Sequence, residues 1–170
     1  MAGEVPADLV TIGKPMGNGY PVAAVVGPAG LVDPFVEATD YFSTFGGGTA
    51  ACAAALAVLR TIESEGIVAH VAAVGARLVA ALREATADRA DVAAVRGWGL
   101  AIGIDVVDPA TRVPDPARAL RIVEGIHDRG VLVGRTSPTG ATLKVRPPLV
   151  FGDEHVHLLT EALSDTLADQ

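Results

Sequence analysis

The sequence has a single cysteine, Cys52, so no disulfide can form within the chain. An unpaired thiol is typical of proteins in reducing compartments. We therefore expect a cytoplasmic protein. Cys52 itself stands in an alanine-rich segment, where it is expected to be a small core residue rather than a nucleophile.

Positive charge is also scarce. The 13 lysines and arginines are outnumbered by 20 aspartates and glutamates, which gives a formal net charge of −7. Surfaces that bind nucleic acids or anionic membranes are basic, so we expect neither partner. The N-terminal residues 1–8 have no basic region followed by an apolar one, which argues against a secretory signal or a transit peptide.

Long hydrophobic runs are absent as well. The longest uncharged, mostly apolar run, Thr49 to Leu59, has 11 residues, whereas a membrane-spanning helix needs roughly 20. No membrane segment is expected. With 50% hydrophobic residues in 170, the chain can instead bury a core as one large or two small globular domains.

Lys14 is prominent because it is one of only two lysines and follows an apolar run, Leu9 to Ile12, directly before a turn rich in glycine and proline. A strand that ends at such a turn would hold this amine in place. An amine is nucleophilic only when it is uncharged, and burial favours that form, as Schiff-base chemistry requires. On residue type alone, a lysine that extends to solvent from the end of a strand is the more ordinary interpretation.

A second glycine-rich stretch, Tyr41 to Gly48, precedes an alanine-rich helix. Unpaired N–H groups and the positive end of the helix dipole suit a phosphate at this point, and the hydroxyls of Ser43 and Thr44 add donors. The alternative is a turn with Thr49 as the helix cap and no ligand.

Apolar periodicity and turn residues predict the remaining elements. The boundary between two domains is expected at Gly66, with domains of residues 1–66 and 67–170, and the second should be α+β with a mainly antiparallel sheet. The expected helices are 28–36, 49–65, 67–87, 115–130 and 153–167, and the expected strands are 9–12, 22–26, 92–95, 100–106, 131–133 and 143–145, with a turn at 96–99.

Lys144 and Arg146 lie two residues apart on an extended segment, where alternate side chains share a face. Together they could bind an anion, or they could be two solvated cations. His155 and His157 point in different directions on a helix, so no metal site is expected.

Four segments resemble the class III, fold-type I aminotransferases that depend on pyridoxal phosphate (PLP). These segments are GKPMGNGYP, YFSTFGG, VRGWGLAIGI and KVRPPLVF, and they occur in the order found in that family. The resemblance is strongest to the branch with alanine–glyoxylate transaminases and ethanolamine-phosphate phospho-lyases. It implies an α/β fold in which residues 1–66 are the tail of the large, mostly parallel-sheet, PLP-binding domain and residues 67–170 are a small C-terminal domain.

The resemblance also implies roles for single residues. Lys14 matches the lysine that binds PLP as a Schiff base and moves the substrate proton. Ser43 and Thr44 match a pair that contacts the cofactor phosphate of the other subunit of a homodimer. Lys144 stands where many members have an arginine for the substrate carboxylate, and Arg146 is close by. Because lysine cannot form the bidentate fork of arginine, this change suits a phosphate at least as well.

The family's remaining cofactor-binding motifs precede its lysine, and only thirteen residues precede Lys14 here. The sequence is therefore expected to be the C-terminal portion of a transaminase that acts on amines and keto acids. Two alternatives stay open: a phospho-lyase that acts on an amino-alcohol phosphate, and a non-catalytic remnant that only pairs with a partner chain.

Overall fold

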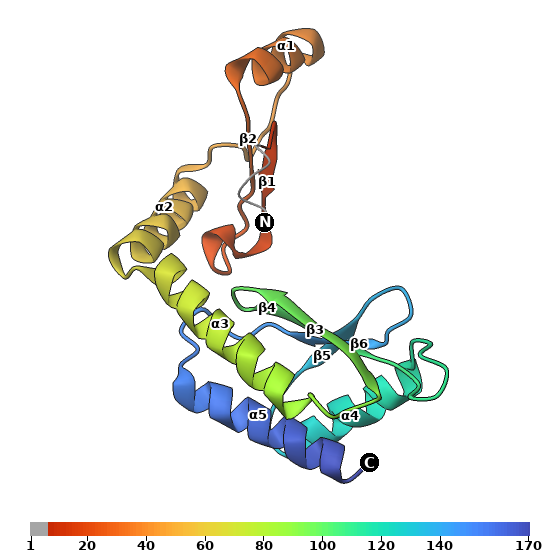
Figure 1. The fold of residues 1–170 in the computed structure, drawn as a ribbon. Coiled ribbons are helices and arrows are strands. Elements are labelled where there is room, and N and C mark those ends of the chain that lie inside the picture. Colours follow the sequence, from red (N-terminus) through yellow and green to blue (C-terminus); the bar gives the residue numbers. More distant parts are fainter. Residues whose placement is uncertain (1–6) are drawn as a thin grey trace. The chain divides into compact units, whose positions relative to one another are not determined.

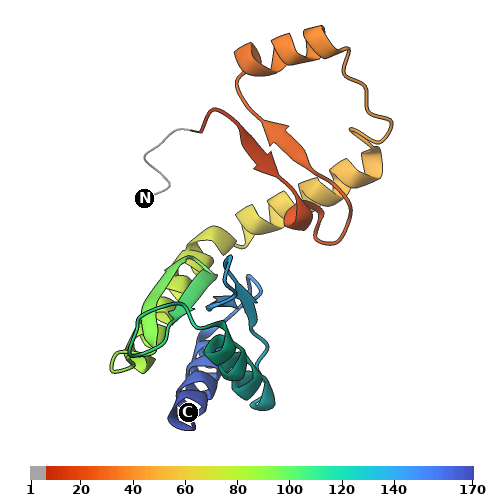
Figure 2. The ribbon, with the colours of Figure 1, turned by 90° about the vertical axis from the view of Figure 1, so that its right-hand side faces the viewer.

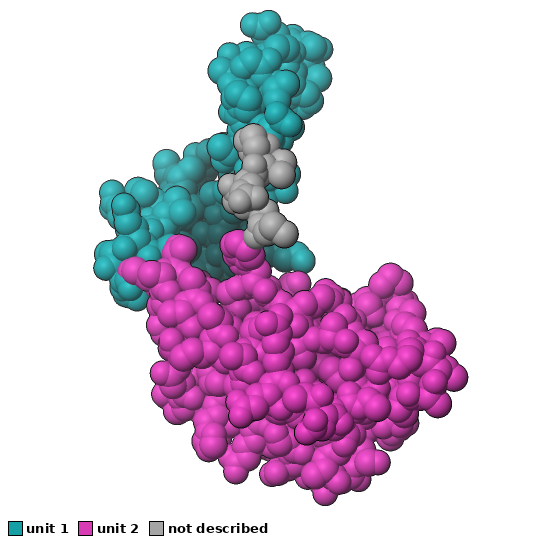
Figure 3. All heavy atoms as spheres, viewed as in Figure 1, with its two compact units in different colours: residues 1–65 teal, residues 66–170 magenta. Residues whose placement is uncertain are grey.

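The computed structural model describes residues 7–170, so most of the N-terminal segment inspected for a targeting signal lies outside the described residues. The chain divides into two compact units, unit 1 with residues 1–65 and unit 2 with residues 66–170 (Figure 3). Each unit combines helices with strands. Among residues 7–170, no single helix is both long and apolar enough to cross a membrane.

Unit 1 is a two-stranded ribbon with two α-helices and one 3₁₀ turn (Figure 1). Its strands are antiparallel and pair Val10 with Val26 and Ile12 with Ala24. In chain order the elements are β1 (Val10–Ile12), η1 (Lys14–Gly17), β2 (Ala24–Val26), α1 (Ala29–Thr39) and α2 (Thr49–Ser64). Two expectations need correction: β2 begins two residues later than expected, and Pro28 is the N-cap of α1 rather than its first helical residue.

Unit 2 has a four-stranded sheet of order β3-β4-β6-β5, and every pair in it is antiparallel, as expected. Helices α3, α4 and α5 complete the unit (Figures 1 and 2). The elements are α3 (Ile67–Ala85), β3 (Val92–Trp98), β4 (Ala101–Val106), α4 (Pro116–Asp128), β5 (Gly134–Thr136), β6 (Thr142–Val145) and α5 (Asp153–Ala168).

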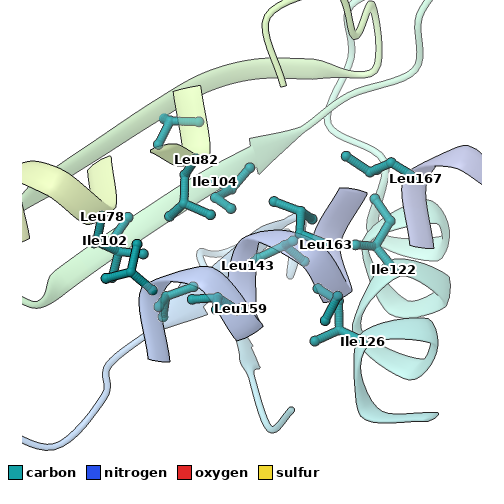
Figure 4. Close-up of a cluster of buried hydrophobic side chains, with 14 of the residues drawn as sticks. Leu78, Leu82, Ile102, Ile104, Ile122, Ile126, Leu143, Leu159, Leu163 and Leu167 are labelled. Atoms are coloured by element: carbon teal, nitrogen blue, oxygen red, sulfur yellow. The ribbon is translucent and has the colours of Figure 1, made fainter. Parts of the chain in front are cut away.

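One hydrophobic core holds unit 2 together, and it lies between one face of the sheet and the three helices. Figure 4 shows leucines and isoleucines from helices and strands converging there. Ile102 and Ile104 of β4 pair with Val145 and Leu143 of β6, so these four side chains share the buried face. The alternating apolar pattern of the strands therefore specified which face of the sheet is buried.

Two helix ends have the capping residues that the sequence predicts. The Asp115 carboxylate accepts a hydrogen bond from the Arg118 backbone N–H at 2.9 Å, and Pro116 is the first residue of α4. Gly66, between α2 and α3, has a left-handed backbone (φ 62°), as expected for a glycine that follows the end of a helix.

Two expected features of the sheet are wrong. Residues 96–98 are not a turn but the end of β3, where Arg96 pairs with Gly103 and Trp98 with Ala101. The 131–133 segment is not a strand, although Val131 and Val133 pack against the core. Strand β5 lies three residues later, where Gly134–Thr136 pair with β6.

Candidate functional site

Lys14 is the first residue of η1 and directly follows Gly13 after β1. Its backbone is left-handed (φ 45°), a conformation that costs energy for a residue with a Cβ and that often occurs at functional positions. The turn is closed by hydrogen bonds from the N–H of Met16 to the carbonyl of Gly13 (3.3 Å) and from Asn18 to Pro15 (3.0 Å). The Lys14 side chain is exposed, so the enclosure expected for its amine does not come from the described residues.

Ser43 and Thr44 lie on the loop that leads into α2, and both are exposed. The Ser43 Oγ accepts a hydrogen bond from the Gly46 N–H at 2.9 Å, which leaves the hydroxyl proton available for another acceptor. Gly48 is the N-cap of α2, and no side chain accepts a hydrogen bond from the first turn of the helix. The alternative in which Thr49 caps the helix is therefore wrong, and the first-turn N–H groups can bind an anion.

Two cavities adjoin this loop. One, of about 520 Å³, is lined by Ser43, by Met16 from the lysine turn and by residues of α2. The other, of about 530 Å³, is lined by Thr44, Phe45 and the N-terminal residues of α2. Thus the lysine turn and the Ser43 loop meet at one cavity, although Lys14 itself is not among the residues that line it.

Phe45 lines both cavities and was not among the residues expected to contribute to the site. The sequence carried a signal, because Phe45 follows Thr44 directly within the glycine-rich stretch. Its side chain is 89% exposed. A ring so placed offers an apolar contact beside the loop hydroxyls.

Lys144 and Arg146 belong to unit 2. Lys144 is half-buried on β6, and its side chain lies beside Gly134 of β5, where a Cβ would come within 4.0 Å of its Nζ. Arg146 is exposed just beyond the strand and lines a cavity of about 330 Å³, which Lys144 does not line. Neither cation has a hydrogen bond or ion pair to any residue in the described part of the chain.

Beside Lys144, the outer face of the sheet carries an ion pair that sequence inspection missed. Arg96 donates two hydrogen bonds of 2.9 Å to Asp105, and Thr142 donates a third of 2.7 Å. The hydrogen bonds from Arg96 are the main reason that the pKa of Asp105 is lowered, against the opposing effect of burial. Asp105 is thus paired with Arg96, and among the described residues no acidic side chain forms an ion pair with Lys144.

The histidines do not form a metal site. Within residues 7–170 no group of three histidine, cysteine, aspartate or glutamate side chains is arranged to bind a metal ion. His155 Nδ1 instead accepts a hydrogen bond from the Gly152 N–H at 3.1 Å, at the start of α5.

Known proteins resemble the chain over nearly all of its length. A phospholyase from Arthrobacter, solved in complex with phosphoethanolamine, matches 98% of the chain with 41% identity and a TM-score of 0.93. An aminotransferase from Bacillus anthracis matches 98% with 28% identity and a TM-score of 0.86. Among curated sequences, "Ethanolamine-phosphate phospho-lyase homolog 1" of Caenorhabditis elegans is 36% identical over 94% of the chain. "Alanine--glyoxylate aminotransferase 2 homolog 2, mitochondrial" of Arabidopsis thaliana is 33% identical over 98%.

The match covers only part of each relative. The chain spans 35% of the length of both curated relatives and 40% of the two solved chains, over their C-terminal part. The family model described as "Aminotransferase class-III" matches residues 1–167. The chain therefore belongs to the class III aminotransferase family and has the mixed α/β fold of the C-terminal part of these enzymes.

Proposed function

We propose that the chain contributes the lysine-bearing part of a PLP-dependent transaminase that moves an amino group from an amine or amino acid to a keto acid. The observation that carries the proposal is Lys14, held with a left-handed backbone in a closed turn after β1, in a chain of the class III family. PLP, when bound, stabilises negative charge on the substrate carbon. Lys14 would hold the cofactor through its Nζ, and the same amine would move the substrate proton.

The cofactor phosphate has a matching set of donors in unit 1. The hydroxyls of Ser43 and Thr44 and the uncapped N–H groups of the first turn of α2 are all available to an anion. The proposal assigns these groups to the phosphate bound by the other subunit of a homodimer. In unit 2, Lys144 and Arg146 are proposed to anchor the anionic group of the substrate.

A phospho-lyase acting on an amino-alcohol phosphate is the second candidate. It is favoured by the Arthrobacter phospholyase, whose structure contains phosphoethanolamine, and by the Caenorhabditis elegans relative. Lys144 supports it, because a lysine binds a phosphate as a point charge but does not reproduce the fork that arginine offers to a carboxylate. Cytoplasm remains the proposed compartment on the basis of the unpaired Cys52, although the Arabidopsis thaliana relative is described as mitochondrial.

The two enzymatic candidates differ in their products. The 170-residue chain, joined to the N-terminal part of the Arthrobacter phospholyase, would be supplied with PLP and assayed with phosphoethanolamine and with alanine plus glyoxylate. A transaminase consumes the keto acid, whereas a phospho-lyase releases inorganic phosphate without an amino acceptor. If the protein assembles and binds PLP but forms neither product, we conclude that the chain is a non-catalytic remnant.

The lysine assignment has a direct chemical test. Borohydride reduction fixes PLP on the amine that binds it, and this chain has only two lysines, Lys14 and Lys144. We expect peptide mapping to find the label on Lys14. Label on Lys144 alone would disprove the assignment.

A further inference from the structure

The peptide group between Phe151 and Gly152 is bound by two histidines from different helices. His70 of α3 lies with its Nε2 3.0 Å from the carbonyl oxygen of this group, which belongs to Phe151. The N–H of the same group, which belongs to Gly152, donates to His155 Nδ1 of α5 at 3.1 Å. Helices α3 and α5 pack side by side (Figure 1), and Gly152 is the N-cap of α5. The two imidazole rings therefore fix the start of α5 against α3.

The two histidines need different protonation states. A carbonyl oxygen only accepts hydrogen bonds, so His70 must carry a proton on Nε2, as both the charged ring and one neutral tautomer do. An N–H group only donates, so His155 Nδ1 must be without a proton, which is true of the neutral ring alone. Proton uptake therefore preserves the first hydrogen bond and removes the second.

The groups around His155 have opposing effects on its protonation. Glu154 Oε1 lies 3.4 Å from His155 Nδ1 and would pair with a charged ring. Three features disfavour that charge: the Gly152 N–H, the positive end of the α5 dipole, and Arg146, which lines the same cavity as His155. Residues 130–133 also line this cavity and have no titratable side chain.

On the side of α3, His70 and the ion pair between Arg77 and Asp153 lie at the start of α5. The pair has an N–O distance of 2.7 Å, and guanidinium and carboxylate groups keep their charges over the range in which imidazoles titrate. Protonation of His155 therefore leaves this link between α3 and α5 in place. The change is confined to the Phe151–Gly152 peptide group and to the Phe151 ring, whose centroid lies 5.2 Å from that of the His155 ring.

We propose that His70 and His155 form a pH-sensitive latch on the segment between β6 and α5, the segment that contains Arg146. At neutral pH the uncharged His155 caps α5 and the latch is closed. On acidification His155 takes up a proton, the Gly152 N–H loses its acceptor and the latch opens. The inference concerns unit 2 alone, so it goes beyond the proposed function and does not depend on the chemistry at Lys14.

The sign of the effect on stability follows from the proton count. The unfolded chain has no cap that excludes a proton from His155, so it binds more protons than the closed latch does. Stability from the cap is therefore present above the pH range in which imidazoles titrate and is lost as the pH falls through that range.

The test compares the 170-residue chain with three variants. His155→Gln supplies an amide oxygen that can accept from the Gly152 N–H, as glutamine does at the same position of a capping box, but it does not titrate. His155→Ala removes the acceptor at every pH. His157→Gln is the matched control, because His157 is also in α5 but its side chain is 79% exposed and lies 3.9 Å from Glu161.

Thermal melts of unit 2 at pH 8 and pH 5.5, followed by the fluorescence of Trp98, give the first result. We expect the Tm of the unsubstituted chain and of His157→Gln to fall by about 2–6 °C more than that of His155→Gln, which is the size expected for the loss of one helix cap in a domain of this length. His155→Ala should have the lower Tm already at pH 8 and no larger fall than His155→Gln. An equal fall in the unsubstituted chain and in His155→Gln would overturn the proposal.

Nuclear magnetic resonance tests the latch without unfolding the protein. The amide resonance of Gly152 should shift with pH together with the ring resonances of His155, and this shift should be absent in His155→Gln. A Gly152 amide that does not respond while His155 takes up its proton would show that the hydrogen bond is not a pH-dependent one.

Discussion

At the residue scale, Lys14 combines an uncommon backbone conformation with the chain's only amine in unit 1 apart from the N-terminus. In a full-length or reassembled protein, Lys14→Ala should lower turnover by a factor on the order of 10² to 10⁴ or more, because both the covalent link and the proton transfer are lost. Steady-state rates measure the effect. A Lys14→Ala protein with normal turnover would refute the assigned role.

Lys144→Ala is the matched control. It should raise KM more than it lowers kcat.

Gly75 shows how closely α3 approaches the β3–β4 turn. A Cβ at this position would lie 2.2 Å from the carbonyl oxygen of Gly99. Gly75→Ala should therefore lower the free energy of unfolding by about 1–3 kcal/mol, because the helix or the turn must move. Urea unfolding followed by the fluorescence of Trp98, the single tryptophan, reports on unit 2.

Gly30→Ala is the control for this substitution. Gly30 lies in α1, and a Cβ there meets no atom within 4 Å. Its effect on unit 2 should stay within about 0.5 kcal/mol. If both variants lower the free energy of unfolding by the same amount, the close approach of Gly75 to Gly99 does not restrict the residue at position 75.

Some features set by local residue types were predicted correctly from the sequence, whereas contacts between residues that folding brings together were not. The left-handed glycine at position 66 and the cap at Asp115 follow from their own residue types. The roles of Asp91 and Asp105 could not be predicted, because their arginine partners are brought to them by folding. The assignments of Lys14, Ser43 and Thr44 came from the family resemblance and stay predictions.

At the element scale, the buried Asp91 connects the loop between α3 and β3 to α4, and its partner Arg89, in the same loop, connects it to α5. Asp91 is 3% exposed and accepts hydrogen bonds from Arg89 (2.8 and 2.9 Å) and from Arg118 of α4 (3.0 Å). Arg89 also donates to the carbonyl of Leu167 in α5 (2.9 Å). Asp91→Ala should lower the free energy of unfolding by about 3 kcal/mol, because it leaves two arginines without their shared acceptor.

A surface ion pair gives the comparison. Asp153 and Arg77 are 2.7 Å apart, but their side chains are 71% and 50% exposed. Asp153→Ala should therefore cost less than about 1 kcal/mol in the same denaturation experiment. If Asp153→Ala lowers the free energy of unfolding as much as Asp91→Ala does, burial does not explain the larger effect expected for Asp91.

The same network predicts how stability depends on pH. Burial by itself raises the pKa of Asp91, but the hydrogen bonds and charge of Arg89, with the charge of Arg118, outweigh it and lower the pKa. A group with a lowered pKa in the folded state stabilises the fold above its unfolded pKa, about 4, and this contribution is lost as the pH falls through the folded value. Thermal melts between pH 7 and pH 3 should show the loss, and Asp91→Asn should weaken the pH dependence.

The misplaced strand and turn have a common cause at this scale. Val131 and Val133 satisfy the apolar pattern of a strand, but they pack against the core without strand partners, and β6 selects Gly134–Thr136 instead. Gly97 and Gly99 suggested a turn, yet the ladder to β4 continues through Gly97 and Trp98. The ends of a strand depend on the strand with which it pairs, and the sequence of one segment carries no information about that partner.

At the scale of the whole molecule, the two units differ in how much of their apolar surface they bury. Unit 2 has a core of leucine, isoleucine and valine, whereas unit 1 buries Ala55 among its described hydrophobic residues. In the isolated chain, we expect amides of residues 7–65 to exchange at least tenfold faster than those of the core helices of unit 2. Hydrogen exchange with mass spectrometry measures this, and similar protection in both units would contradict the expectation.

The isolated chain should also bind PLP weakly or not at all and show no turnover. It spans 35 to 40% of its relatives, and Lys14 is exposed. One lysine and two hydroxyls supply neither a ring contact nor a charge partner for the cofactor's ring nitrogen. Spectral titration with PLP decides the question: saturable micromolar binding with alanine-dependent turnover would contradict the prediction.

The strand order of unit 2 has a consequence for its synthesis. β6 follows β5 in the sequence but lies between β4 and β5, and α5, the last element, contributes Leu159, Leu163 and Leu167 to the core. While the ribosome is still making residues 142–168, the β3–β4 hairpin is the one ladder of this sheet that can form, and α3 lacks its covering helix. Unit 2 should therefore fold as a whole only after α5 has been synthesised, rather than segment by segment as the chain emerges.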